Sequence, residues 1–174
     1  PQAVRLLFDD DAQIRSRARY VLESLKDPRL VKIFEKGVYG KQFSLLGLDE
    51  KRAFLVSSGR LNREAGLVFI RKLALQGNVL SSIQTKETQS AALQALGILK
   101  DTESLSMLEQ QKKSLKNSQL IKSAAGYAIS VIQRDEKGAL VKSNADNTVR
   151  GIPVNRQCTN NQNGTNNKYA QLFG

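Results

Sequence analysis

The chain has 174 residues, of which 40% are hydrophobic, and this is enough for one domain with a buried core. It has no histidine, no tryptophan and one cysteine, which excludes histidine general bases, His/Cys zinc sites and intrachain disulfides. Lysine and arginine number 27 against 16 acidic residues, a formal net charge of +11. This surplus favours an acidic partner, such as nucleic acid, an anionic membrane surface or an acidic protein.

Targeting and membrane signals are absent from the sequence itself. No apolar run approaches the roughly 20 residues needed to cross a bilayer, and nothing resembles a signal peptide. The chain begins at Pro1 rather than Met, so we expect a processed or truncated piece of a longer protein. By default we expect a cytoplasmic protein, and no pattern indicates its oligomeric state.

The first part of the chain predicts a helical end followed by a helical hairpin. Residues 1–8 have apolar side chains in helical positions, which we interpret as the end of a preceding repeat. In the unit at about residues 11–36, Asp11 is the predicted N-cap of a helix that reaches about Leu25. Asp27 and Pro28 then start a second helix. The apolar stripe of the first helix contains Ile14, Ala18, Val21, Leu22 and Leu25.

Three further units follow, at about residues 50–76, 86–116 and 118–136. The second turns at Arg63-Glu64, and its Gly59 and Gly66 permit close packing of helices. The third turns at Lys100-Asp101 between two apolar-periodic segments. The connecting segments Gly37–Glu50 and Gly77–Thr85 are predicted to be loops.

The units repeat in sequence. Ala18–Asp27 aligns with Ala92–Asp101, so that Glu23 corresponds to Gly97, and Phe54–Leu61 aligns with Ala125–Ile132. Anchoring the units on Leu25, Leu61, Leu99 and Ile132 gives intervals of 36, 38 and 33 residues. These intervals match a two-helix repeat rather than the shorter spacing of a β-sandwich.

One segment carries a family resemblance. Ala91-Ala92-Leu93-Gln94-Ala95-Leu96-Gly97-Ile98-Leu99-Lys100-Asp101 resembles the short bacterial form of the HEAT repeat, in which an Ala/Leu/Gly-rich first helix precedes an Asp-initiated second helix. The resemblance extends over about residues 11–136, with Glu23 where the family has glycine and Phe54 where it has a small residue. It implies an all-α fold, a right-handed α-solenoid of about four HEAT-like helical hairpins with an irregular C-terminal tail. It also implies a scaffold that binds protein partners. The apolar end at residues 1–8, interpreted as part of a preceding repeat, leads us to expect the C-terminal part of a longer repeat array.

The tail at residues 137–174 differs in composition from the repeats. It contains eight asparagines, against three in residues 1–136, and has five basic residues and one acidic residue. Such a polar segment cannot bury enough apolar surface to offset its chain entropy. We therefore predict an Asn-rich basic tail that is extended or disordered.

Cations near the ends of the predicted second helices are the candidate partner-binding residues. They are Lys32, Lys36, Arg71, Lys72, Lys112, Lys113 and Lys116. Stacked repeats would align them into a basic ridge on the concave face that the resemblance implies, able to bind an acidic protein or phosphates. The alternative is that these cations are solvated and complement the helix dipoles. Phe34, Phe69 and Tyr127 have core-like spacing, which argues against base stacking.

Two other charged clusters have simpler interpretations. Arg15, Arg17 and Arg19 are expected on a solvated outer helix, and Asp9-Asp10-Asp11 is expected to cap that helix rather than bind metal. No catalytic, cofactor-binding or metal-ligating residue is predicted.

The hypothesis from sequence is a non-enzymatic HEAT-repeat scaffold that binds a protein partner through its concave second-helix face, and the charge balance favours an acidic partner. The alternative is a nucleic-acid-binding HEAT-like protein with a DNA glycosylase-like architecture and a basic concave ridge. For that alternative, no aspartate of this chain matches the catalytic constellation of the glycosylases. No cofactor is predicted under either hypothesis.

Overall fold

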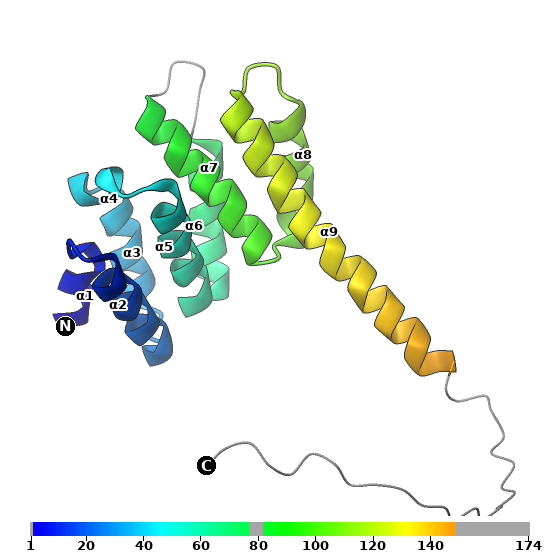
Figure 1. The fold of residues 1–174 in the computed structure, drawn as a ribbon, viewed down its shortest axis with the longest axis horizontal. Helices are drawn as coiled ribbons and strands as arrows, with labels where there is room; N and C mark the ends of the chain where they lie inside the picture. The colour runs from blue at the N-terminus through cyan, green and yellow to red at the C-terminus, as the bar shows by residue number, and fades with distance from the viewer. Residues whose placement is uncertain (1, 77–81, 149–174) are drawn as a thin grey trace, which may run out of the picture. The chain divides into compact units, whose positions relative to one another are not determined.

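The computed structural model describes residues 2–76 and 82–148, and every regular element in these ranges is a helix (Figure 1). The chain divides into two compact units, Pro1–Ala139 and Leu140–Gly174. The first contains all the helical hairpins. The second contains the end of the last helix, and residues 149–174 lie outside the described ranges. The all-α class predicted from sequence is confirmed.

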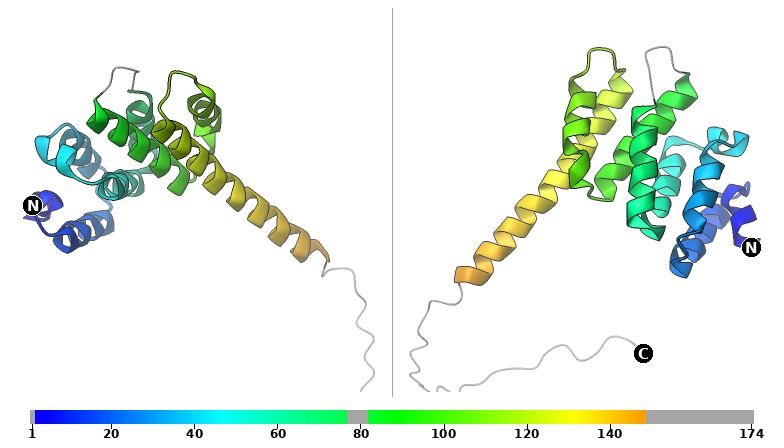
Figure 2. Two further views of the ribbon diagram at one scale, coloured as in Figure 1. Left: turned by 45° about the horizontal axis from the view of Figure 1, so that its top comes forward. Right: turned by 180° about the vertical axis from the view of Figure 1, so that it is seen from behind.

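The helices form consecutive hairpins. In chain order the elements are α1 (Gln2–Arg5), the 3-10 turn η1 (Leu6–Phe8), α2 (Ala12–Leu25), α3 (Leu30–Val38), α4 (Lys41–Leu45), α5 (Leu48–Leu61), α6 (Arg63–Leu75), α7 (Ile83–Ile98), the 3-10 turn η2 (Thr102–Ser104), α8 (Leu105–Lys113) and α9 (Gln119–Thr148). The pairs α2/α3, α5/α6 and α7/α8 are hairpins, and α9 is the first helix of a fourth unit. In the compact unit Pro1–Ala139, the first helices of the repeats lie in one layer and the second helices lie in the other (Figure 2). The first layer contains α2, α5, α7 and α9, and the second contains α3, α6 and α8.

Local sequence signals set the helix starts. The Asp11 carboxylate accepts a hydrogen bond from the Gln13 N–H at 2.7 Å, as expected for an N-cap. Asp27 accepts from the Arg29 N–H at 3.0 Å and thereby orders the turn that leads into α3. Helix α3 begins at Leu30, later than predicted, because the Leu30 and Val31 N–H groups bond to carbonyls three residues earlier, in turns rather than in an α-helical pattern. The predicted loop 37–50 also contains the short helix α4 and the first turn of α5.

An aromatic cluster joins the first hairpin to the second. The Phe54 ring is fully buried, and its centroid lies 4.6 Å from that of Phe34, 5.3 Å from that of Phe43 and 5.5 Å from that of Phe8. Aromatic pairs at such distances add to the free energy gained by burying each ring. Phe54, which replaces the small residue of the family pattern, thus packs against η1, α3 and α4 together.

Glycines let neighbouring helices approach closely, as the sequence predicted for Gly66. A Cβ atom at Gly66 would lie 2.6 Å from the Ser58 carbonyl oxygen, where α6 crosses α5. A Cβ atom at Gly97 would lie 2.6 Å from Ala128 Cα, where α7 meets α9. Both distances are shorter than van der Waals contact, so any larger side chain would push the helices apart.

The predicted apolar stripe of α2 is only partly in the core. Ala18 and Leu22 are buried, but Ile14, Val21 and Leu25 are 38%, 46% and 58% exposed. Most contacts of α2 are with α1, η1 and α5, and these elements cover a narrower strip of α2 than its apolar periodicity defines.

Two further predictions concern aromatic residues and the tail. Phe34 and Phe69 are buried as expected, but Tyr127 is 45% exposed because it falls outside the buried face of α9. Residues 137–148, predicted to be extended or disordered, continue helix α9, and no proline interrupts them. The rest of the predicted tail, 149–174, lies outside the described residues.

Not one of the described helices combines the length and the apolar character needed to cross a membrane.

Candidate functional site

The second-helix face, which we define as the exposed surface of α3, α6 and α8, contains most of the predicted cations. Lys32 and Lys36 lie on α3, Lys72 on α6 and Lys112 on α8, and Lys116 follows α8 in the turn before α9. All five side chains are exposed, and none forms an ion pair with a described residue. That this face is concave remains a prediction.

Arg71 has a different environment from these lysines. Its guanidinium donates two hydrogen bonds to the Asp101 carboxylate, at 2.7 and 2.5 Å, and one to Glu103 at 2.8 Å. Burial by itself raises the pKa of the Asp101 carboxyl, but hydrogen bonds from Arg71 and Ser104 and the nearby positive charges outweigh it, so the pKa is below its usual value. Arg71 therefore clamps α6 to the turn after α7.

Lys113 is also partly engaged. Its ammonium group lies 3.7 Å from the Glu109 carboxylate one turn earlier on α8, and both side chains face solvent. An exposed pair of this kind contributes little to stability. The seven predicted cations thus divide into five free lysines, one weakly paired lysine and one arginine that holds two repeats together.

A groove of about 450 Å³ runs between α3 and α6 on the second-helix face. Glu35 lines it from α3, and Glu64, Val68 and Lys72 line it from α6. Val68 is 62% exposed, so the groove offers a ligand an apolar contact beside its charged side chains. This arrangement suits a chain segment that carries both apolar and charged side chains.

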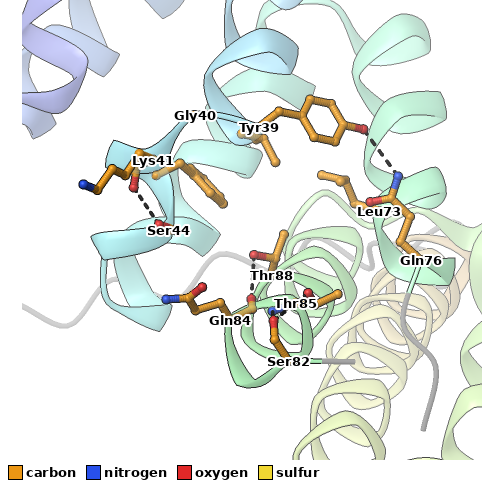
Figure 3. A pocket seen from close by; sticks show the side chains of 12 residues that line it. Tyr39, Gly40, Lys41, Ser44, Leu73, Gln76, Ser82, Gln84, Thr85 and Thr88 are labelled. Carbon is orange, nitrogen blue, oxygen red and sulfur yellow. Dashed lines mark hydrogen bonds between the residues drawn. The ribbon is translucent and has the colours of Figure 1, made fainter. Parts of the chain in front are cut away.

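A second pocket, of about 280 Å³, lies at one end of the hairpins, where the end of α3, the short helix α4, the end of α6 and the start of α7 meet (Figure 3). Its wall includes the predicted loop around Tyr39 and Lys41. Gln76 donates to the Tyr39 hydroxyl at 3.4 Å, and Thr88 donates to the Gln84 carbonyl on its own helix at 3.0 Å. The described lining includes no carboxylate, and its hydroxyls are mostly bonded to neighbouring groups, so the pocket has no acid–base pair.

The arginines of α2 are not uniformly solvated, which corrects the prediction from sequence. Arg17 is exposed, but Arg15 binds the Glu50 carboxylate through two nitrogens at 2.7 and 2.6 Å. Arg19 is only 8% exposed. The sequence does contain a signal for the burial of Arg19. This residue lies between Ala18 and Leu22, beside the buried strip of the helix.

The predicted capping role of the acidic run is consistent with the geometry. Asp11 caps α2, and the backbone carbonyls of Asp9 and Asp10 accept hydrogen bonds from Arg15 at 2.6 and 2.8 Å. Among residues 2–76 and 82–148, no group of three His, Cys, Asp or Glu side chains is placed to hold a metal ion.

Stacked helical hairpins in two layers define the class of protein: this chain has the fold of a HEAT-like α-solenoid. A solved structure of human deoxyhypusine hydroxylase in complex with glycerol has a similar fold, with a TM-score of 0.57 and 16% sequence identity. The alignment covers 79% of this chain but 44% of the hydroxylase, so the chain spans less than half of that protein. No protein-family model matches the chain. No curated protein matches it in sequence.

This likeness corrects the prediction that the chain is not an enzyme. The matched protein is a hydroxylase, so a helical-repeat fold of this kind is compatible with catalysis. The prediction was wrong in taking the repeat and the lack of recognisable catalytic side chains as grounds to exclude activity. A fold positions side chains but does not determine their chemistry. At this level of identity the likeness shows the fold alone.

Proposed function

We propose that this chain binds an acidic segment of another protein along its second-helix face. The observation that carries the proposal is the set of exposed lysines on α3, α6 and α8 with no carboxylate partner among the described residues. A helical-repeat surface suits an extended ligand, because successive repeats present equivalent positions along its length. The Ala91–Asp101 segment also supports membership of the HEAT repeat family, since it folds as a first helix and its turn.

The groove between α3 and α6 favours protein over nucleic acid as the ligand. Glu35 and Glu64 line it together with Lys72, so a ligand must place its acidic groups at the lysines outside the groove and an apolar group inside it, which a peptide of mixed side chains can do and a backbone charged at every nucleotide cannot. The exposed Val68 side chain can contact an apolar side chain of a bound peptide. Phe34 and Phe69 are buried, so neither can stack on bases.

The proposal is tested by selecting ligands from random sequences. A displayed library of random peptides is selected on the immobilised wild-type protein, and the enriched peptides are titrated by fluorescence anisotropy. We expect enrichment of Asp and Glu beside aliphatic residues. Replacing Lys32→Glu together with Lys72→Glu should weaken binding about tenfold, because each reversal turns an attraction of under about 1 kcal/mol into a repulsion.

A matched control carries the same change in net charge at other exposed positions. Arg5→Glu together with Arg17→Glu alters α1 and α2 and leaves the second-helix face intact. Equal loss of binding in both double variants would mean that net charge, and not this face, attracts the ligand. Duplex DNA bound at micromolar or better affinity, with an affinity that falls steeply between about 50 and about 200 mM salt, would instead favour the nucleic-acid hypothesis.

A further inference from the structure

A polar groove of about 370 Å³ lies on the other layer of the domain, between α2 and α5 and beside the end of α7. The repeat differs at this place from the contact between α7 and α9. Where Gly97 lets α7 meet Ala128 of α9 directly, the corresponding α2 residue is Glu23, which accepts a hydrogen bond from Ser57 of α5. Both Glu23 and Ser57 line the groove.

Each carboxylate around this groove already has a cationic partner. Glu23 lies 3.6 Å from the Arg60 guanidinium in addition to its bond from Ser57. Asp49 pairs with Arg52 at 2.8 Å. Just beyond them, Glu50 accepts hydrogen bonds from Nε and Nη2 of Arg15. No carboxylate of this described group is left over for another cation.

Arg19 is the cation that remains. Its side chain lines the groove and is only 8% exposed, and its Nη1 atom is buried with no hydrogen-bond partner among the described residues. Burial lowers the pKa of this guanidinium, and the charge of Arg15 lowers it further, against the raising effect of Glu50 and Glu23. Burying a guanidinium without acceptors is unfavourable unless something supplies them.

We propose that this groove binds a carboxylate group, with Arg19 as its principal donor. The charged side chains that line it are Arg19, Arg52 and Arg60 against Glu23 and Asp49, three cations against two anions. The net charge of +1 matches a monoanion and not a phosphate dianion, which the two carboxylates would repel. A guanidinium fork presents two parallel N–H donors to a carboxylate, and on ligand binding Arg19 would turn about the outer torsions of its side chain to bring the buried Nη1 to the groove.

The apolar part of the groove defines what accompanies the carboxylate. Val56 and Ile98 form part of the wall, and the Tyr20 ring stands at the edge with 74% exposure. The ligand class is therefore a monocarboxylate attached to a small apolar or aromatic body. A free organic acid and the terminal carboxylate of a peptide both belong to this class, and the groove volume lies in the range of small-molecule sites.

The first experiment titrates the full chain with sodium benzoate, with benzamide as the uncharged ligand of the same shape. We expect benzoate to bind with a Kd of about 1 mM or weaker, given its few atoms, and to shift the Arg19 Nε–H resonance in nuclear magnetic resonance spectra. Benzamide should bind at least tenfold more weakly. Equal binding of the two ligands, or no binding of benzoate, would overturn the proposal. Inorganic phosphate that bound more tightly than benzoate would overturn it as well.

Variants separate binding from stability. Arg19→Met should abolish benzoate binding and leave the melting temperature at or above that of the wild type, because it removes a buried group without a partner. Arg17→Met, on the exposed side of the same helix, should change neither. Undiminished benzoate affinity in Arg19→Met would refute the assignment. If that variant did not fold, Arg19→Lys would replace it, with weaker binding expected because lysine lacks the fork.

The source of the carboxylate is resolved with a short peptide that ends in Leu-Phe, prepared as the free acid and as the amide. Tighter binding of the acid than of benzoate assigns the groove to a peptide terminus, and weaker binding assigns it to a free organic acid. Either result supports a carboxylate site. Equal affinity of the acid and the amide contradicts it.

Discussion

Lys51 and Glu87 offer a test of how charge is accommodated between the second and third repeats. The Lys51 side chain on α5 is completely buried, and its ammonium nitrogen lies 2.7 Å from a carboxylate oxygen of Glu87 on α7. The Glu87 side chain is 36% exposed. The buried Lys51 ammonium therefore depends on Glu87 for its counter-charge, whereas water can reach the Glu87 carboxylate.

This asymmetry predicts unequal effects of the two neutralising substitutions. Glu87→Gln leaves the buried ammonium without its counter-charge, and we expect a loss of about 2–3 kcal/mol, below the roughly 3–5 kcal/mol of a fully buried pair because water reaches Glu87. Lys51→Met replaces the charge by an apolar chain of similar length and leaves Glu87 hydrated. We expect its unfolding free energy to stay within about 1 kcal/mol of the wild type.

Urea denaturation followed by far-ultraviolet circular dichroism measures both effects. Glu87→Gln should lower the midpoint by about 1 M or more with an unchanged slope, and Lys51→Met should leave the midpoint nearly constant. The double variant should resemble Lys51→Met alone, because the penalty of Glu87→Gln exists only while the ammonium is present. A larger loss for Lys51→Met than for Glu87→Gln would refute this reasoning and show that the ammonium itself is net stabilising.

Three further outcomes follow from the packing and the charge network. Gly97→Ala should destabilise the domain by about 1–3 kcal/mol in urea melts because α7 and α9 meet there, whereas Gly126→Ala, with its nearest neighbour 3.9 Å away, should stabilise α9 by up to about 1 kcal/mol. Phe54→Ala should cost about 3–5 kcal/mol in the same assay, and a cost under about 1 kcal/mol would mean that its aromatic cluster is not a core. The pKa of Asp101 is lowered in the folded state, so its contribution to stability is present above about pH 4 and is lost as the pH falls through the folded pKa. The stability difference between wild type and Asp101→Asn should therefore shrink on acidification, and a constant difference would contradict the role assigned to Arg71.

Much of the architecture could be predicted from the sequence because the signals are local. Asp11 is a helix cap through contact with residues two positions away, and the apolar period fixes which segments are helical. The repeat of about 36 residues follows from alignments of the chain with itself. These features need no information about which helix lies beside which.

Side-chain environments could not be predicted in the same way. Arg71 was predicted to face a partner, but its acceptor Asp101 comes from the next repeat, 30 residues along the chain. The wide apolar stripe of α2 was assigned entirely to the core, and its neighbours cover only part of it. Helical periodicity gives the direction in which each side chain points from the helix axis, but not which residues of other helices lie opposite it.

Local information in the sequence thus determined the all-α class, the capped start of α2 and the two-helix period of the repeats. Only the tertiary structure decided which of the many cations are free, because that depends on carboxylates supplied by neighbouring repeats. Arg15 forms an ion pair with Glu50 across the α2–α5 contact, and Lys51 forms one with Glu87 across the α5–α7 contact. Arg19, in contrast, has a buried nitrogen without an acceptor among the described residues. Whether a charge is partnered is a property of distance in space, and for Arg15 and Lys51 the partner lies a full repeat away along the chain.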